Sequence, residues 1–132
     1  MNKALGMVEF KTVSSGMRAA DRMVKTADVD LIQADTVCPG KYLALISGEL
    51  SAVKASVDAA KTKFTDKVID SFVLGNPHDS IFSAIYGATQ PEGVEALGVM
   101  ESFSAATAIE AADAAAKTAL VELIELRLAR GM

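Results

Sequence analysis

The side chain best suited to chemistry in this sequence is Cys38, the only cysteine among 132 residues. It stands in the segment TVCPGK at 36–41, a Pro-Gly turn between two runs that both read as β-strands. A thiolate is a nucleophile and a ligand for soft metals. A free cysteine also commonly behaves as a small hydrophobe, and from the residues alone a small buried or incidental thiol is the favoured interpretation.

No other residue in the chain indicates catalysis. His78 follows Pro77 in a turn and has no second histidine and no cysteine near it, which disfavours a metal or catalytic role. Asp79 or Ser80 after it reads as a helix cap. The chain has no glycine-rich phosphate loop, no plausible Ser-His-Asp set and no paired carboxylates in an apolar context, so we do not expect an enzyme.

Composition narrows the class of protein further. The chain is 51% hydrophobic, carries a net charge of −4 and has a pI near 4.9, which argues against nucleic acid as a partner. A single cysteine excludes an internal disulfide framework and suits a reducing cytosol. No apolar run reaches the ~20 residues that a membrane span needs, and no signal peptide is recognisable at the start. We therefore expect a cytoplasmic protein.

The spacing of apolar residues predicts the elements around the turn. Four runs read as strands, at 4–11, 28–37, 42–46 and 68–74. A helix capped by Ser14 or Ser15 is expected between the first two, and a second helix follows 42–46. Their predicted apolar faces comprise Met17, Ala20, Val24 and Ala27 in the first helix and Leu50, Val53, Val57, Ala60 and Phe64 in the second.

The resulting order is βαββαβ, followed by a short helix around 80–86. This order predicts an α+β, ferredoxin-like fold in which both helices cover one face of an antiparallel sheet. The other face should then be polar or should meet something else.

The chain also repeats itself. A shift of 92 residues aligns it with itself without gaps and gives 13 identical pairs in roughly 38 positions. The LGxxE strand and the VxLI strand recur at the same offset, which chance similarity between alanine-rich helices does not explain.

The repeat divides the chain into a complete domain at 1–87, a linker at 88–94 and a partial second copy at 95–132. The partial copy should be βαβ and lacks the following strand, helix and strand. A half-domain of this kind exposes sheet edges and should not be stable alone, so a longer chain or another chain should complete it.

Three short motifs together resemble the bacterial microcompartment shell domain. They are the strand ALGMVE at 4–9, the helix end DxxxKxAxV at 21–29 and the turn PGK at 39–41. The duplication resembles the tandem-domain shell proteins, which form trimers that imitate hexamers. The CPGK turn is similar to that of the propanediol-utilisation type, in which three cysteines, one per subunit, hold a [4Fe–4S] cluster at the central pore.

The resemblance implies roles for particular residues. Cys38 would be the cluster ligand, Lys25 and Lys117 would lie at tile edges, and the pore would be lined by Val37, Cys38, Pro39, Gly40 and Lys41. From the residues alone, solvated helix charge is the favoured interpretation of both edge lysines. In the second copy, Arg130 stands near the position that Cys38 has in the first, so the two copies are not expected to be equivalent at the pore.

Three functions follow in order of preference. The first is a shell tile whose pore cluster passes electrons across the shell. The second is a tile without a cluster, whose pore passes small polar metabolites and takes its charge from Lys41. The third is a ferredoxin-like regulator that binds a small ligand. The first two imply self-assembly into homotrimers and sheets with other shell proteins, with encapsulated enzymes or a redox partner nearby.

Overall fold

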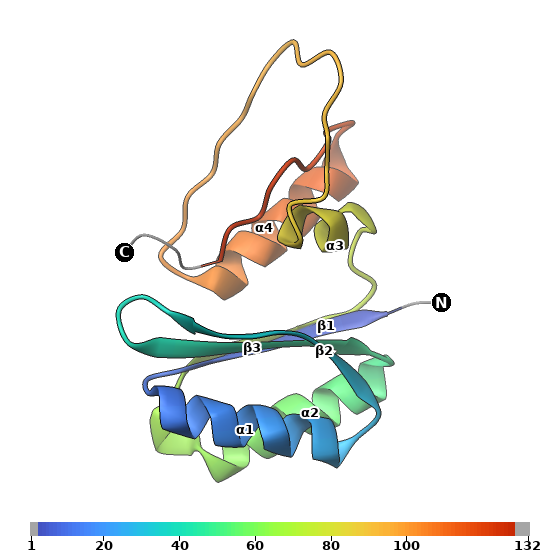
Figure 1. The fold of residues 1–132 in the computed structure, drawn as a ribbon. Helices are drawn as coiled ribbons and strands as arrows, with labels where there is room; N and C mark the ends of the chain where they lie inside the picture. Colours follow the sequence, from blue (N-terminus) through green and yellow to red (C-terminus); the bar gives the residue numbers. More distant parts are fainter. Residues whose placement is uncertain (1–2, 129–132) are drawn as a thin grey trace. The chain divides into compact units, whose positions relative to one another are not determined.

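The computed structural model describes residues 3–128 of the chain (Figure 1). Those residues divide into two compact units, 3–76 and 77–128. The first unit contains β1 (Ala4–Phe10), α1 (Val13–Thr26), β2 (Val29–Val37), β3 (Lys41–Gly48), α2 (Leu50–Lys63), η1 (Thr65–Lys67) and β4 (Val68–Leu74). The second unit contains α3 (Ser80–Ile85) and α4 (Ala105–Thr118).

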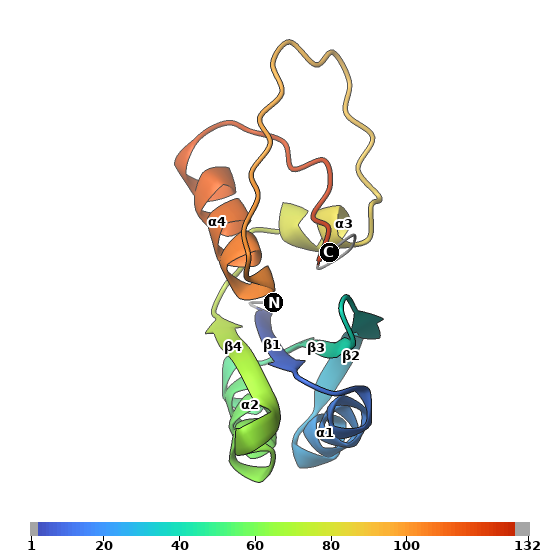
Figure 2. The same cartoon turned by 90° about the vertical axis from the view of Figure 1, so that its left-hand side faces the viewer.

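The first unit has the predicted βαββαβ order. Its four strands form one sheet in the order β2-β3-β1-β4, and every neighbouring pair is antiparallel. Helices α1 and α2 lie side by side on one face of this sheet (Figures 1 and 2). The α+β, ferredoxin-like prediction is therefore confirmed for the first copy.

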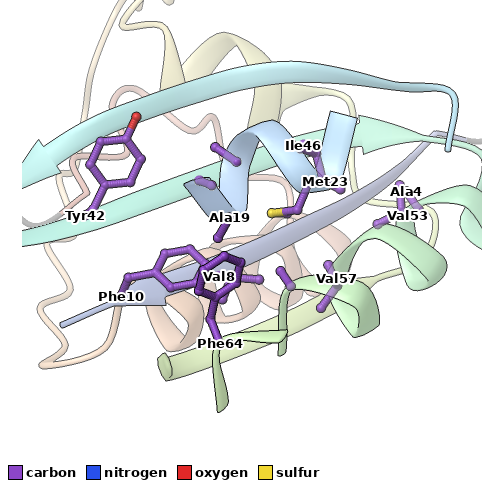
Figure 3. Close-up of a cluster of buried hydrophobic side chains, with 13 residues drawn as sticks. Ala4, Val8, Phe10, Ala19, Met23, Tyr42, Ile46, Val53, Val57 and Phe64 are labelled. Carbon is purple, nitrogen blue, oxygen red and sulfur yellow. The ribbon is translucent and has the colours of Figure 1, made fainter. Parts of the chain in front are cut away.

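The core of the first unit lies between this sheet face and the two helices (Figure 3). Alternate residues of the central strands enter it because successive side chains of a strand point to opposite faces. Its aromatic members include Phe10 and Phe64, whose rings meet edge to face with centroids 6.4 Å apart. Its buried members are Ala4, Val8, Phe10, Ala19, Ala20, Met23, Tyr42, Ala44, Ile46, Val53, Val57, Ala60 and Phe64.

Helix α1 buries a different face from the one predicted. The structure buries Gly16, Ala19, Ala20 and Met23, and leaves Met17 exposed. The reason is close packing: a Cβ on Gly16 would collide with the Tyr42 side chain, so this helix approaches β3 through its smallest residues. The helix also begins earlier than predicted, with Thr12 at the N-cap position and no side-chain cap bond.

Helix α2 follows its predicted stripe, with Val53, Val57 and Ala60 buried and only Leu50 at its start exposed. The helix lies close to β1 because Gly6 has no side chain. A Cβ at Gly6 would lie 2.6 Å from Cγ1 of Val53 and 2.8 Å from Cγ2 of Val57.

The sheet face away from α1 and α2 is apolar at its centre. Leu5, Met7, Leu43 and Leu45 alternate with core residues along β1 and β3, and all four are buried. Of the two predicted alternatives, a polar face is therefore excluded for this central part, and its burial agrees with the other, a face that meets something else.

The second copy is present as a helix at the predicted offset. Helix α1 shifted by 92 residues has the bounds of α4, and both helices have 14 residues. Near the end of each, a threonine hydroxyl donates to the carbonyl four residues earlier: Thr26 to Arg22 at 2.7 Å and Thr118 to Ala114 at 2.6 Å.

The two strands expected beside α4 are not formed. The structure assigns no strand to 95–101 or to 121–124. In the first copy β1 pairs with both β3 and β4, and β2 pairs with β3. With the 92-residue offset the counterpart of β3 would begin at 133, after the last residue of this sequence. Without a partner strand, a segment has no ladder of backbone hydrogen bonds to join.

Helix α3 belongs to the same compact unit as α4, whereas the sequence-based boundary at residue 87 places it with the first domain. The Leu126 backbone N–H donates to the carbonyl of Ala84 in α3 at 3.0 Å, which joins the end of the described chain to this helix. Within residues 3–128, no helix is long and apolar enough to cross a membrane.

Replacing Gly6 with alanine should destabilise the protein by about 1–3 kcal/mol, because the added methyl overpacks the contact with α2. Urea denaturation followed by circular dichroism measures this as a lower midpoint. Gly98, the counterpart of Gly6 at the 92-residue offset, has no atom within 4 Å of the position its Cβ would take. Gly98→Ala should therefore change stability by less than about 0.5 kcal/mol. Equal effects of the two substitutions would contradict the packing argument.

Candidate functional site

The turn between β2 and β3 is a tight hairpin. Val37 pairs with Lys41, which leaves Cys38, Pro39 and Gly40 as the loop. The Cys38–Pro39 peptide bond is cis, and Gly40 has a φ of 79°. No atom lies within 4 Å of where a Gly40 Cβ would be, so glycine is needed here for its backbone conformation and not for space.

Cys38 is exposed and its thiol is free. Of the interpretations that the residues alone favour, a buried thiol is therefore wrong for the single chain, whereas an incidental thiol agrees with the structure. The described residues contain no group of three or more histidine, cysteine, aspartate or glutamate side chains that could hold a metal ion. A metal at Cys38 would thus need its remaining ligands from other molecules.

Lys41, at the other end of the loop, is engaged in an ion pair. Its Nζ donates to Oε1 of Glu9 in β1 at 2.7 Å, and the Lys41 and Glu9 side chains are 25% and 4% exposed. Glu9 was not among the residues predicted from the sequence, since 32 residues separate it from Lys41. Its sequence signals are its place at the end of the ALGMVE motif and its recurrence as Glu101 in the second copy.

Val37 and Tyr42 flank this pair on the two strands, and both are buried. Burial, and secondarily the Asp35 carboxylate, raises the pKa of the Tyr42 phenol above its ordinary value. Tyr42 is therefore neutral at physiological pH, and the charged side chains at this end of the sheet include Lys41, Glu9 and Asp35.

The two predicted edge lysines make the same local pair in different surroundings. Lys25 lies 2.8 Å from Asp21, whose side chain is 59% exposed, and Lys117 lies 2.6 Å from Asp113, whose side chain is only 7% exposed. The Lys25 pair is the solvated helix charge that the residues alone favour. The edge role of both lysines stays a prediction.

Asp113 is a structural residue that the sequence did not single out. Its Oδ1 accepts a hydrogen bond from the backbone N–H of His78 at 2.7 Å, while its Oδ2 accepts from Lys117. The His78 ring lies 2.7 Å from the Ser80 hydroxyl and accepts from the Ser80 backbone N–H at 3.2 Å. The His78 ring therefore contacts the first residue of α3. Arg130, the predicted counterpart of Cys38 in the second copy, lies outside the described residues.

Comparison with known proteins agrees with this architecture. The family model for the BMC domain matches residues 4–77 and again 96–132. The chain is 36% identical over its whole length to the bacterial microcompartment shell protein PduT of Citrobacter freundii, and covers 72% of that protein. A solved structure of a microcompartment protein from Desulfitobacterium hafniense DCB is 45% identical in sequence and has a TM-score of 0.92. The match covers the whole of this chain and 73% of the chain in that structure.

A second relative matches a shorter stretch. The bacterial microcompartment shell protein PduA of Citrobacter freundii is 36% identical over 81 residues, which are 60% of this chain and 87% of that protein. The fold, the repeat and these matches define the class as a bacterial microcompartment shell protein. The chain belongs to the BMC domain family, and within it to the tandem-domain type that PduT represents.

Replacing Asp113 with alanine should weaken the α3–α4 unit by about 1–3 kcal/mol, because it leaves a backbone N–H without its acceptor. Native-state hydrogen exchange at the His78 amide measures this as faster exchange. Asp21→Ala removes the matching but exposed carboxylate, and should change stability by less than about 0.5 kcal/mol. Unchanged His78 exchange in the Asp113 variant would contradict this role.

Proposed function

We propose that this chain is a structural tile of a microcompartment shell, in which three copies form a ring and their β2–β3 turns meet at a central pore. The observation that carries the proposal is the exposed Cys38 on a three-residue hairpin loop. Family membership and the tandem repeat support the structural part.

In a closed ring of three copies, the β2–β3 turns can lie around the central axis. In cyclic symmetry the same segment of every subunit lies at the same distance from the axis, so a turn that faces the axis is repeated around it. Gly40 has open space beside its Cα, which suits close approach between copies. The pore would then be lined by the segment 37–41 of each copy.

Cys38 could supply one of three cysteine ligands of an iron–sulfur cluster that is shared by three copies. One chain offers one exposed thiol, and thiolates are the usual protein ligands of a [4Fe–4S] cluster. Three copies would supply three Cys38 ligands and leave one iron without a protein ligand. Such a cluster, when bound, supplies one-electron transfer across the shell; the chain's own part is to present the thiol at the loop.

A tile without a cluster is the second candidate. In that case the same ring of turns would pass small polar molecules, and Cys38 would only line the opening. The ion pair between Lys41 and Glu9 bears on this candidate, because it offsets the positive charge that Lys41 would bring to the opening. A soluble ligand-binding regulator, the third candidate, would form discrete oligomers instead of sheets.

Iron and acid-labile sulfide on anaerobically purified protein should give roughly four irons per three chains. Cys38→Ser should abolish both, because each chain offers a single thiol. The native trimer, measured by light scattering, should persist in the serine variant. No iron in either protein after attempted reconstitution would reject the cluster and leave the metabolite pore.

Electron microscopy tests the tile itself. The protein, mixed with a single-domain shell protein, should form extended sheets, and Lys25→Ala should reduce them if Lys25 lies at a tile edge. Lys54→Ala removes another exposed lysine, in α2, and should leave sheet formation unchanged. Discrete oligomers without sheets under every condition would favour the regulator.

A further inference from the structure

We infer that Glu9 is a positioning residue of the turn: it binds the Lys41 ammonium and cancels its charge beside Cys38. The inference rests on the proposed function only where it concerns which molecules a pore admits. The local claim, that Glu9 compensates Lys41 at the turn, concerns a single copy of the first unit.

The strand register brings the two side chains together. Glu9 pairs with Leu43 across β1 and β3, and Lys41 is two residues before Leu43 on the same strand. Lys41 and Glu9 are therefore diagonal neighbours on the same sheet face, within reach of a long side chain. The resulting 2.7 Å contact joins a nearly buried carboxylate to a mostly buried ammonium. A charge-assisted bond with little access to water is stronger than an exposed one.

Carboxylates of two other strands also lie on this face of the sheet. Asp35 of β2 pairs with Leu43, and Asp70 of β4 pairs with Glu9, so both lie on the face that Glu9 and Lys41 share. Asp70 also accepts a hydrogen bond from the Ser71 backbone N–H at 2.8 Å. Glu9 is the carboxylate that contacts Lys41, and Asp35 and Asp70 only share its sheet face.

The pairing changes what the turn can select. A free lysine at the loop would attract anions toward Cys38, whereas a neutralised one does not. The proposed pore would therefore admit neutral, polar small molecules without preference for anions. This lack of preference for anions would depend on Glu9, which lies on a strand outside the loop. Lys41 without Glu9 would attract anions instead.

Cys38 itself can report this charge, because it is the only cysteine in the chain. Iron-free protein is treated at fixed pH with two methanethiosulfonate reagents, one carrying a sulfonate and one carrying a trimethylammonium group. Both react through the same group, so the ratio of their rates cancels the thiol's own reactivity and reports the local potential. The anionic-to-cationic ratio should rise about two- to fivefold in Glu9→Gln at low salt, and the rise should shrink at high salt.

Three further variants make the test specific. Lys41→Met should lower the ratio by a similar factor, and the double variant should return close to the original protein. Glu9→Asp keeps the charge and should also resemble the original, which a purely structural role of Glu9 does not require. An unchanged ratio in Glu9→Gln alongside a lower one in Lys41→Met would overturn the inference, because Lys41 would then act at the turn without its partner.

The outcome is separable from that of the proposed function. The rate ratio is measured on protein that carries no iron and does not depend on sheet formation. Failure to form rings or sheets would reject the tile and leave the charge pair intact. An unchanged ratio in a protein that does form sheets would reject the role of Glu9 alone.

Discussion

Hydrogen-bonded pairing of β1 with strands on both of its sides is the constraint on which the rest of the structure depends. With β3 and β4 in place, β1 forms the middle of a sheet that α1 and α2 can cover. The same pairing positions Glu9 beside the end of β3, where the candidate turn begins. In the second copy the helix forms at the matching offset, whereas the flanking segments remain without strands. A helix satisfies most of its backbone within itself, and a strand cannot.

The candidate site combines a reactive group that the loop exposes with a charge that the sheet controls. Cys38 lies on a loop whose conformation depends on Gly40, and Lys41 at its end is bound to a carboxylate from a different strand. The thiol is therefore free to meet other molecules, while the neighbouring ammonium is not. This division suits a surface that is completed by other copies of the chain.

The two copies use one sequence pattern in different surroundings. The Asp-x-x-x-Lys pair of α1 is solvated, whereas that of α4 includes a buried carboxylate that also binds the backbone of His78. Likewise Gly6 is required by close packing against α2, and its counterpart Gly98 has no such neighbour. Identity between repeats therefore does not establish identical roles, and each copy depends on the elements packed against it.

The sequence by itself determined the order of elements in the first copy, the 92-residue repeat, the turn and its cysteine. These follow from short-range patterns: alternation in strands, spacing of three and four in helices, and Pro-Gly turn chemistry. Tertiary structure decided which face of α1 is buried, because that depends on the fit of Gly16 against Tyr42. It also decided that Asp113 binds the backbone of His78 and that Glu9 forms an ion pair with Lys41. Each of these depends on residues distant in the chain, whose meeting is set by strand register and packing and not by any local pattern.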